Sequence, residues 1–194
     1  MRATAVCGIM TLVVLGGLPT RLWAEPPTQA VQETIDRLQS ALRDPSLGEE
    51  IRAERAWEAV LTRVDLREMS KRILGPYWEG SGDQQGVFLA AFTAYLHRTF
   101  APKLAALTDA QLICRAEAIH GSRAKVLTSL YLSGEDVKIT FHMHQQGSAW
   151  TIYDVVLDNG RFSLVSSYRA QLQWILQTSS FEELLRVIRE KNAW

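Results

Sequence analysis

The sequence predicts an α+β domain in which helices pack against an antiparallel sheet of about four strands. Apolar residues recur every three or four positions over residues 31–107, as on one face of a helix. Over residues 111–157 the period falls to two, as in strands separated by turns, and the helical period returns over residues 164–188. Helices before and after a meander of strands favour helices packed on the sheet rather than alternating β and α units.

The first helical face is formed by Val31, Ile35, Leu38 and Leu42, between Pro26-Pro27 and Pro45. Ser46-x-x-Glu49 has the spacing of a capping box, which predicts a second helix that carries Trp57 and Leu61. Asp65-x-x-Glu68 predicts a third, short helix that Gly75-Pro76 ends.

Ser81-Gly82-Asp83 then restarts the helical pattern, and Pro102 predicts a kink near the end of this longer helix. Its apolar face is Phe88, Phe92, Tyr95, Leu96 and Phe100. After the strands, a wide stripe over residues 164–176 predicts another helix, and Ser180-x-x-Glu183 predicts a cap for the last one.

Four strands are predicted over residues 111–119, 123–132, 137–144 and 150–157. The fourth is apolar on both faces if its side chains alternate, with Ile152 and Val156 on one face and Val155 and Leu157 on the other. An antiparallel sheet with helices on one side needs only one apolar face. Either helices cover both faces of this strand, which the pattern alone favours, or part of the second face lines a dry cavity.

The composition limits the classes of function. The chain has 194 residues, 47% of them apolar, which fits one folded domain and excludes a disordered chain. Its 21 Lys and Arg balance 21 Asp and Glu, so we expect no nucleic-acid partner, because domains that bind nucleic acid are usually basic. Two cysteines cannot make a disulfide framework.

The first residues have the pattern of a secretory signal peptide. Arg2 precedes an apolar run from Val6 to Leu18, and Ala24 stands just before a polar, Pro-rich segment. As a helix the run would reach roughly 20 Å, which is short of the ~30 Å hydrocarbon layer. We therefore expect a signal peptide at residues 1–24 and a single mature domain at 25–194, with an uncleaved anchor as the alternative.

A search for catalytic chemistry finds only weak candidates. No nucleophile elbow, phosphate-binding Gly loop or Cys-x-x-Cys pair is present. His142 and His144 share one strand face, which could hold zinc but is more typical of a solvated strand, so we predict no metal. His97 is expected at the boundary of the core, and the carboxylates of Asp65 and Glu68 are explained by helix capping.

Asp154 is the one charged residue within the apolar fourth strand. A buried carboxylate needs a partner, which Arg169 or Arg98 could supply. We therefore interpret Asp154 as a structural residue that joins helix to sheet.

Two blocks of the sequence resemble a known family. Residues 65–78 (DLREMSKRILGPYW) and 88–101 (FLAAFTAYLHRTFA) are similar to D-F-x-x-[MI]-[SA]-x-x-[VI]-L-G-x-x-W and F-x-x-x-F-x-x-x-L-x-R-T-[YF]-A. Residues 150–156 (WTIYDVV) and 163–172 (SLVSSYRAQL) are similar to a second block of the same family, the MlaC-type toluene-tolerance proteins. Leu66 in place of Phe and a longer turn over residues 157–163 are departures.

The resemblance implies a periplasmic phospholipid carrier, not an enzyme, that needs no cofactor. Its implied partners are a phospholipid, an inner-membrane MCE-type permease complex of the ABC transporter class and an outer-membrane acceptor complex. It also implies a curved sheet with an apolar cavity between sheet and helices. A carrier of another apolar lipid, such as a hopanoid, and an envelope enzyme or assembly factor remain as alternatives.

The expected lining of that cavity consists of apolar positions in the matching blocks and the neighbouring strands. These residues are Met69, Ile73, Leu74, Trp78, Phe92, Leu96, Phe100, Val137, Ile139, Ile152, Tyr153, Val155, Val165, Tyr168 and Leu172.

Overall fold

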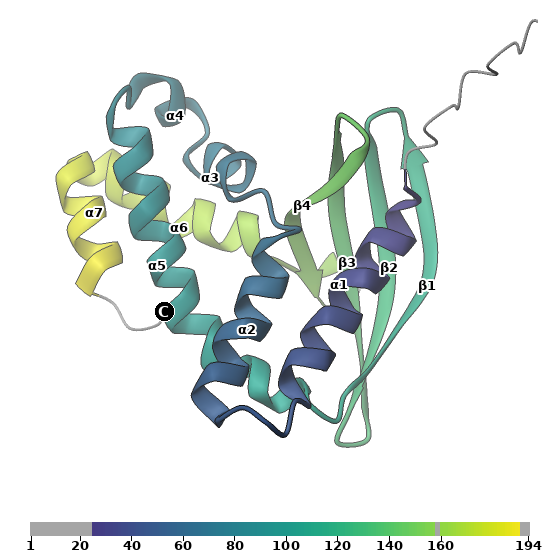
Figure 1. Cartoon of the computed structure of the whole chain (residues 1–194). Coiled ribbons are helices and arrows are strands. Elements are labelled where there is room, and N and C mark those ends of the chain that lie inside the picture. Colours follow the sequence, from purple (N-terminus) through teal and green to yellow (C-terminus); the bar gives the residue numbers. More distant parts are fainter. Residues whose placement is uncertain (1–24, 158–159, 191–194) are drawn as a thin grey trace, which may run out of the picture.

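The computed structural model describes residues 25–157 and 160–190, and the predicted signal peptide at residues 1–24 lies outside them. The described chain is an α+β fold in which a curled antiparallel sheet lies beside a group of helices (Figure 1). None of the helices in these residues is both long enough and apolar enough to cross a membrane.

The helices follow the predicted order, with one short addition. They are α1 (Pro27–Leu42), α2 (Glu49–Leu61), α3 (Leu66–Leu74), α4 (Pro76–Gly80), α5 (Gln84–Leu104), the 3₁₀ turn η1 (Ala105–Leu107), α6 (Leu164–Thr178) and α7 (Phe181–Glu190). The Asp65 carboxylate accepts a hydrogen bond from the backbone N–H of Glu68 at 2.9 Å, which confirms the cap of α3. The cap predicted at Ser46 is wrong, because α2 begins after Gly48 and Ser46 donates instead to Asp44.

The strands form one meander in the order β1 (Gln111–His120), β2 (Arg123–Leu132), β3 (Glu135–Gln146), β4 (Ala149–Leu157) and β5 (Phe162–Ser163). The two-residue β5 was not predicted, because two residues cannot show a period. A second short segment also pairs with β4: Val64 forms a parallel bridge with Ile152, held by the Asp65 N–H to Ile152 C=O bond at 2.8 Å.

Two β-bulges change which side chains share a face. In β4 the register passes from Asp154 opposite His142 to Ile152 opposite Met143, so Tyr153 is the extra residue. Val155 therefore lies on the same face as Ile152, and the strict alternation predicted for this strand is wrong. The bulge at Arg115 in β1 shifts the alternation in the same way.

The sheet has an inner face, which we define as the face that carries Val126, Met143 and Ile152 and packs against α1. The opposite, outer face contains Lys125, Leu127 and His142. On β4, helices α3 and α6 add contacts to those of α1, so this strand is packed by helices from two directions. That arrangement accounts for apolar residues on both faces of β4, although Val155 on its inner face stays half-buried.

Candidate functional site

The apolar interior is divided into two main clusters. The first, which we call the helical core, is built from α2 to α7 and includes Trp57, Phe88, Phe92, Tyr95, Tyr168, Leu172, Leu184 and Ile188. The second, the sheet core, joins α1 to the inner face of the sheet through Ala30, Val31, Ile35, Ala124, Val126, Met143, Trp150 and Ile152. In Figure 1 the helices α3 to α7 lie to one side of the sheet with α1, α2 lies between α1 and α5, and α6 starts at the sheet.

The helical core is centred on aromatic rings. Phe92 is completely buried and lies 5.5 Å from Phe88 in a stacked pair and 5.4 Å from Tyr168 in an edge-on pair. The Tyr168 hydroxyl lies 3.4 Å from that of Tyr95, and burial raises the pKa of Tyr168 well above its ordinary value. A hydroxyl pair of this kind satisfies two polar groups inside an apolar cluster.

The predicted lining residues are divided between the two cores. Members of the helical core are Met69, Ile73, Leu74, Trp78, Phe92, Leu96, Val165, Tyr168 and Leu172, with Phe100 packed at its margin. Ile152 belongs to the sheet core, Val155 packs at its margin, Ile139 is buried, and Val137 and Tyr153 are half-buried. The structure therefore does not bring all fifteen together, and their role as a lining stays a prediction.

Sequence reasoning missed the residues that lie where the cores meet. Val64 packs against both the helical core and the sheet core. Leu104 packs against the helical core and against a third, smaller cluster between α1 and α2. Phe141 is a half-buried margin residue of the sheet core, and its alternation with Ile139 in the third strand was a signal that could have identified it.

Asp154 does join sheet to helix, but the predicted arginine partners are wrong. Its carboxylate accepts hydrogen bonds from the Ser163 hydroxyl at 2.7 Å and from the backbone N–H of Val165 at 3.0 Å, at the start of α6. The backbone donors of a helix N-terminus supply what a cation would otherwise supply. Arg98 instead donates to the carbonyl of Ile188, which fastens α5 to α7.

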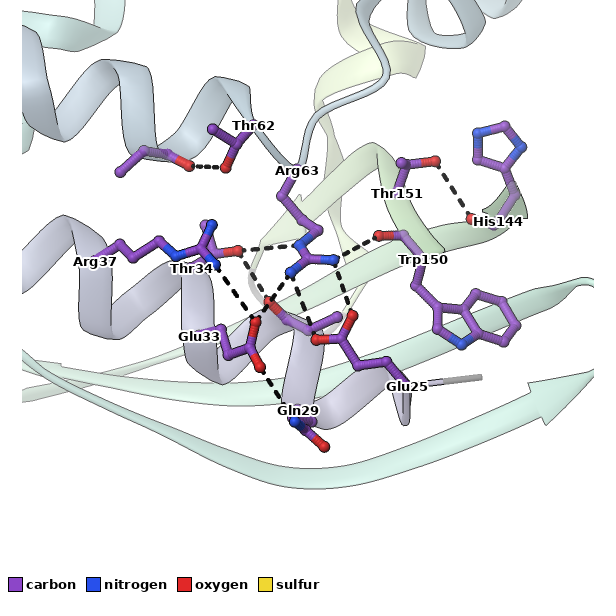
Figure 2. A network of polar contacts seen from close by, with 12 residues as sticks. Glu25, Gln29, Glu33, Thr34, Arg37, Thr62, Arg63, His144, Trp150 and Thr151 are labelled. Carbon is purple, nitrogen blue, oxygen red and sulfur yellow. Dashed lines mark hydrogen bonds and ion pairs between the residues drawn. The ribbon is translucent and has the colours of Figure 1, made fainter. Parts of the chain in front are cut away.

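A buried arginine that the sequence did not single out ties three segments together. The Arg63 guanidinium, just beyond α2, pairs with Glu25 at 3.1 Å and with Glu33 of α1 at 3.4 Å. It also donates to the carbonyl of Trp150 in β4 at 3.4 Å (Figure 2). Arg63 thus links the α2–α3 connection, α1 and the sheet at one point.

The histidines of β3 are less solvated than predicted. His144 lies 2.9 Å from the Asp65 carboxylate and edge-on to the ring of Tyr153, while His142 lies 3.9 Å from Asp154. Burial lowers the pKa of His142, although the neighbouring Asp154 acts in the opposite direction. Within the described residues, no three His, Cys, Asp or Glu side chains are grouped closely enough to hold a metal ion.

Two hollows open on the surface of the described residues. One, of about 570 Å³, lies beside α3 and β3 and is mostly polar, with lining residues Asp65, Arg67, Glu68, Lys71, Trp78, Glu79, Gln85, His144 and Gln146. The other, of about 540 Å³, lies between α2 and α5, where Glu54 and His97 pair at 2.7 Å. His97 is therefore at the boundary of the core, as predicted. Of the predicted lining residues, Trp78 alone contacts either hollow.

The geometry first defines a class: an α+β domain whose sheet core and helical core are separate and meet at half-buried apolar side chains. A family model described as "MlaC protein" matches residues 28–190, and the chain belongs to this family. A comparison with curated proteins found no match.

The fold is similar to the structure of a phospholipid-binding protein from Ralstonia solanacearum, determined in complex with a phospholipid. The TM-score is 0.74 and the sequence identity 19%, over 84% of this chain and 94% of that one. At this identity the likeness establishes the fold.

Proposed function

We propose that this protein is a periplasmic phospholipid carrier. It binds the acyl chains between the sheet core and the helical core and leaves the headgroup in water. Family membership and the phospholipid bound to the similar fold support the class of ligand. The observation that carries the proposal for this chain is the division of its apolar interior into two cores with half-buried apolar residues at their margins.

Hydrocarbon chemistry explains why a carrier needs such a division. Exposing an acyl chain to water costs about 0.8 kcal/mol per methylene, so a sixteen-carbon chain costs about 12 kcal/mol. A phospholipid therefore needs an apolar site deep enough to hold its chains while the headgroup stays solvated. A single continuous core offers no place for the chains, whereas two cores can separate where they meet without either of them unfolding.

The margins of the two cores carry the side chains suited to this role. Phe100 and Leu104 are half-buried at the end of α5, and Phe141 and Val155 are half-buried on the inner face of the sheet. Because these side chains are not fully packed in either core, the acyl chains can bury additional apolar surface there. The fully buried residues, such as Phe92, then form the wall behind them.

The two cores separate about the connection between α2 and α3. Backbone bonds of 2.8 Å join Arg63 and Asp65 to Ile152 of β4, so this connection stays on the sheet. Gly75, where α3 ends, lies inside the helical group, where the Gln173 amide of α6 donates to the carbonyl of Leu74 at 3.3 Å. The pivot therefore lies near residues 62–65 rather than at Gly75.

The partners in this proposal are those that family membership implies, and no contact of the described residues identifies them. In this proposal the carrier exchanges phospholipid with an inner-membrane MCE-type ABC transporter and with an outer-membrane acceptor. A signal peptide at residues 1–24 would deliver the mature domain to the periplasm. The function is that of a binding and transport protein without a catalytic step.

Native mass spectrometry of the mature chain, residues 25–194, tests the proposal. We expect an added mass of one or more phospholipids on the purified protein, loss of this mass on delipidation and its return when phospholipid is added. Val155→Trp, which fills the proposed site, should reduce the lipid-bound fraction at least tenfold. Val87→Trp on the exposed surface of α5 is the matched control and should leave the fraction unchanged.

The identity of the extracted lipid decides between carriers. Extraction of a hopanoid in place of a phospholipid would contradict the proposed ligand but would still support a lipid-carrier function. A bare polypeptide mass that no added lipid changes would refute both.

A further inference from the structure

The outer face of β1 to β3 carries an excess of positive charge. Paired positions in the strand register place Arg123 and Lys125 of β2 on the outer face, and Lys138 of β3 lies there opposite Ser129. Arg115 of β1 joins them through its bonds to the Ser129 hydroxyl at 3.2 Å and to the Tyr131 hydroxyl at 2.6 Å. We call these four residues the basic face.

Most of this charge is not neutralised within the protein. Asp136 pairs with Lys138 at 2.5 Å. Because both side chains are partly exposed to water, this ion pair contributes little to stability. Arg115 bonds to hydroxyls rather than to a carboxylate, and no acidic partner holds Arg123 or Lys125 among the described residues. The chain as a whole has a formal net charge of +0, so its acidic residues lie mainly elsewhere. The basic face is thus a local departure from a neutral molecule.

The side chains between the cations indicate what kind of surface binds here. Ala116 and Ala118 are small and exposed, Leu127 is half-buried, and Ile113, opposite Ser129, is 37% exposed. Protein interfaces usually centre on a large aromatic or aliphatic side chain that enters a pocket of the partner. The one aromatic residue, Tyr131, lies beneath the guanidinium of Arg115 at 5.6 Å and is half-buried. Four cations spread over a flat face, with Ile113 and Leu127 as the only large aliphatic side chains among its described residues and no exposed aromatic ring there, fit an extended, diffuse negative surface better than a pocket.

We propose that the basic face adsorbs the protein onto the surface of an anionic phospholipid bilayer. Anionic headgroups attract Lys and Arg side chains within a Debye length, without insertion into the hydrocarbon. The basic face is on the outer side of the sheet, whereas the proposed acyl-chain site is on the inner side. Adsorption therefore leaves that site free, and the two proposals can fail independently.

Co-sedimentation of the mature chain with lipid vesicles tests the proposal. At 20 mM NaCl the protein should bind vesicles of one part phosphatidylglycerol to three parts phosphatidylethanolamine, and should not bind pure phosphatidylcholine vesicles. Binding to the anionic vesicles should fall steeply by 200 mM NaCl. Arg123→Gln/Lys125→Gln should lower the partition coefficient by about 25-fold, at about fivefold per cation.

The matched control is Arg52→Gln/Arg55→Gln on α2, which removes the same net charge from the helical side. It should bind anionic vesicles as the unmodified chain does. Equal losses in the two variants would overturn the proposal, because net charge rather than this face would then control adsorption. It would also be overturned if the unmodified chain does not co-sediment with anionic vesicles and the basic face binds an acidic protein instead. Both variants should keep their bound phospholipid in native mass spectrometry, which separates this result from failure of the carrier function.

Discussion

The centres of the helical core and of the sheet core exclude water, whereas the margins of both cores are half-buried. In the helical core Phe88, Phe92 and Tyr95 are at most 1% exposed. In the sheet core the side chains under α1 are equally buried, but Phe141, Val155 and Leu112 at its margin are half-buried. Phe100 and Leu104 at the margin of the helical core are half-buried too, so the contrast is between packed centres and half-buried margins. At the sheet margin, the single helix α1 does not cover the whole inner face.

This difference indicates how the fold divides its tasks. A core that is already close-packed gains little from a ligand, because no apolar surface is left to bury. A margin that is only half-buried still gains about 25 cal/mol for each Å² that a hydrocarbon chain covers. The packed centres of the cores therefore supply stability, and their half-buried margins supply the driving force for binding that we propose.

The sharpest test of this division compares two phenylalanines. Phe92→Ala should lower the free energy of unfolding by about 3–5 kcal/mol, because it leaves a cavity in a packed aromatic cluster. Phe141→Ala should cost about 1–2 kcal/mol, because part of its ring is already in water. Urea unfolding of the delipidated proteins measures both. Equal losses would show that the two cores are packed alike.

The next test concerns Arg63, which connects the two regions. Arg63→Met should cost about 2–3 kcal/mol, because it leaves Glu25 and Glu33 without the cation that neutralises them. Arg37→Met removes a second, exposed partner of Glu33 at 3.7 Å and should cost less than about 0.5 kcal/mol. Thermal unfolding of the two variants gives the comparison. A small effect at Arg63 would mean that the N-terminal segment contributes little to holding α1 on the sheet.

The sequence allowed the element order to be predicted because each element has its own periodicity and its own boundary residues. Asp65 illustrates this at α3, where the cap needs only local spacing. Ser46 shows the limit, because the same spacing occurs in a turn in which Asp44 competes for the serine. The spacing at Ser46 is compatible with a helix cap and with a turn, and the carboxylate of Asp44 decides for the turn.

The site was less predictable because it depends on side chains brought together from distant elements. The bulge at Tyr153 moved Val155 to the inner face, and a bulge has no signature in the period of a strand. The sequence could not show whether Asp154 bonds to the start of α6 or to an arginine, because either partner satisfies a buried carboxylate. Val64 was missed because it lies outside regular elements and its parallel bridge spans 88 positions in the sequence.

A smaller effect is expected at the join between β4 and α6. The Ser163 hydroxyl accepts from the Ser166 N–H at 3.0 Å as an N-cap and donates to Asp154, so Ser163→Ala removes both bonds. We expect a loss of about 1–2 kcal/mol in unfolding free energy. Ser180→Ala removes the exposed cap of α7, and its loss should be about 0.5–1 kcal/mol. If the two losses are equal, the bond to the sheet adds nothing to the cap.

The smallest effect is a pH dependence that arises on the outer side of β3. Burial lowers the pKa of His142 in the folded protein below its value of 6.5 in the unfolded chain, where water solvates the imidazolium freely. The unfolded chain therefore binds a proton more readily. The contribution of His142 to stability is fully present above pH 6.5 and is lost as the pH falls through the folded-state pKa.

Urea midpoints at pH 7.5 and pH 5.5 measure this loss. The unmodified protein should be less stable at the lower pH, and His142→Gln should remove part of that difference. An unchanged difference would assign the pH dependence to other groups. Because His142 lies on the outer face and away from the half-buried margin, lipid binding by His142→Gln should match that of the unmodified chain at pH 7.5. A change in lipid binding would mean that the outer face of β3 is coupled to the acyl-chain site on the inner face of the sheet, and the binding region would then have to include the outer face as well.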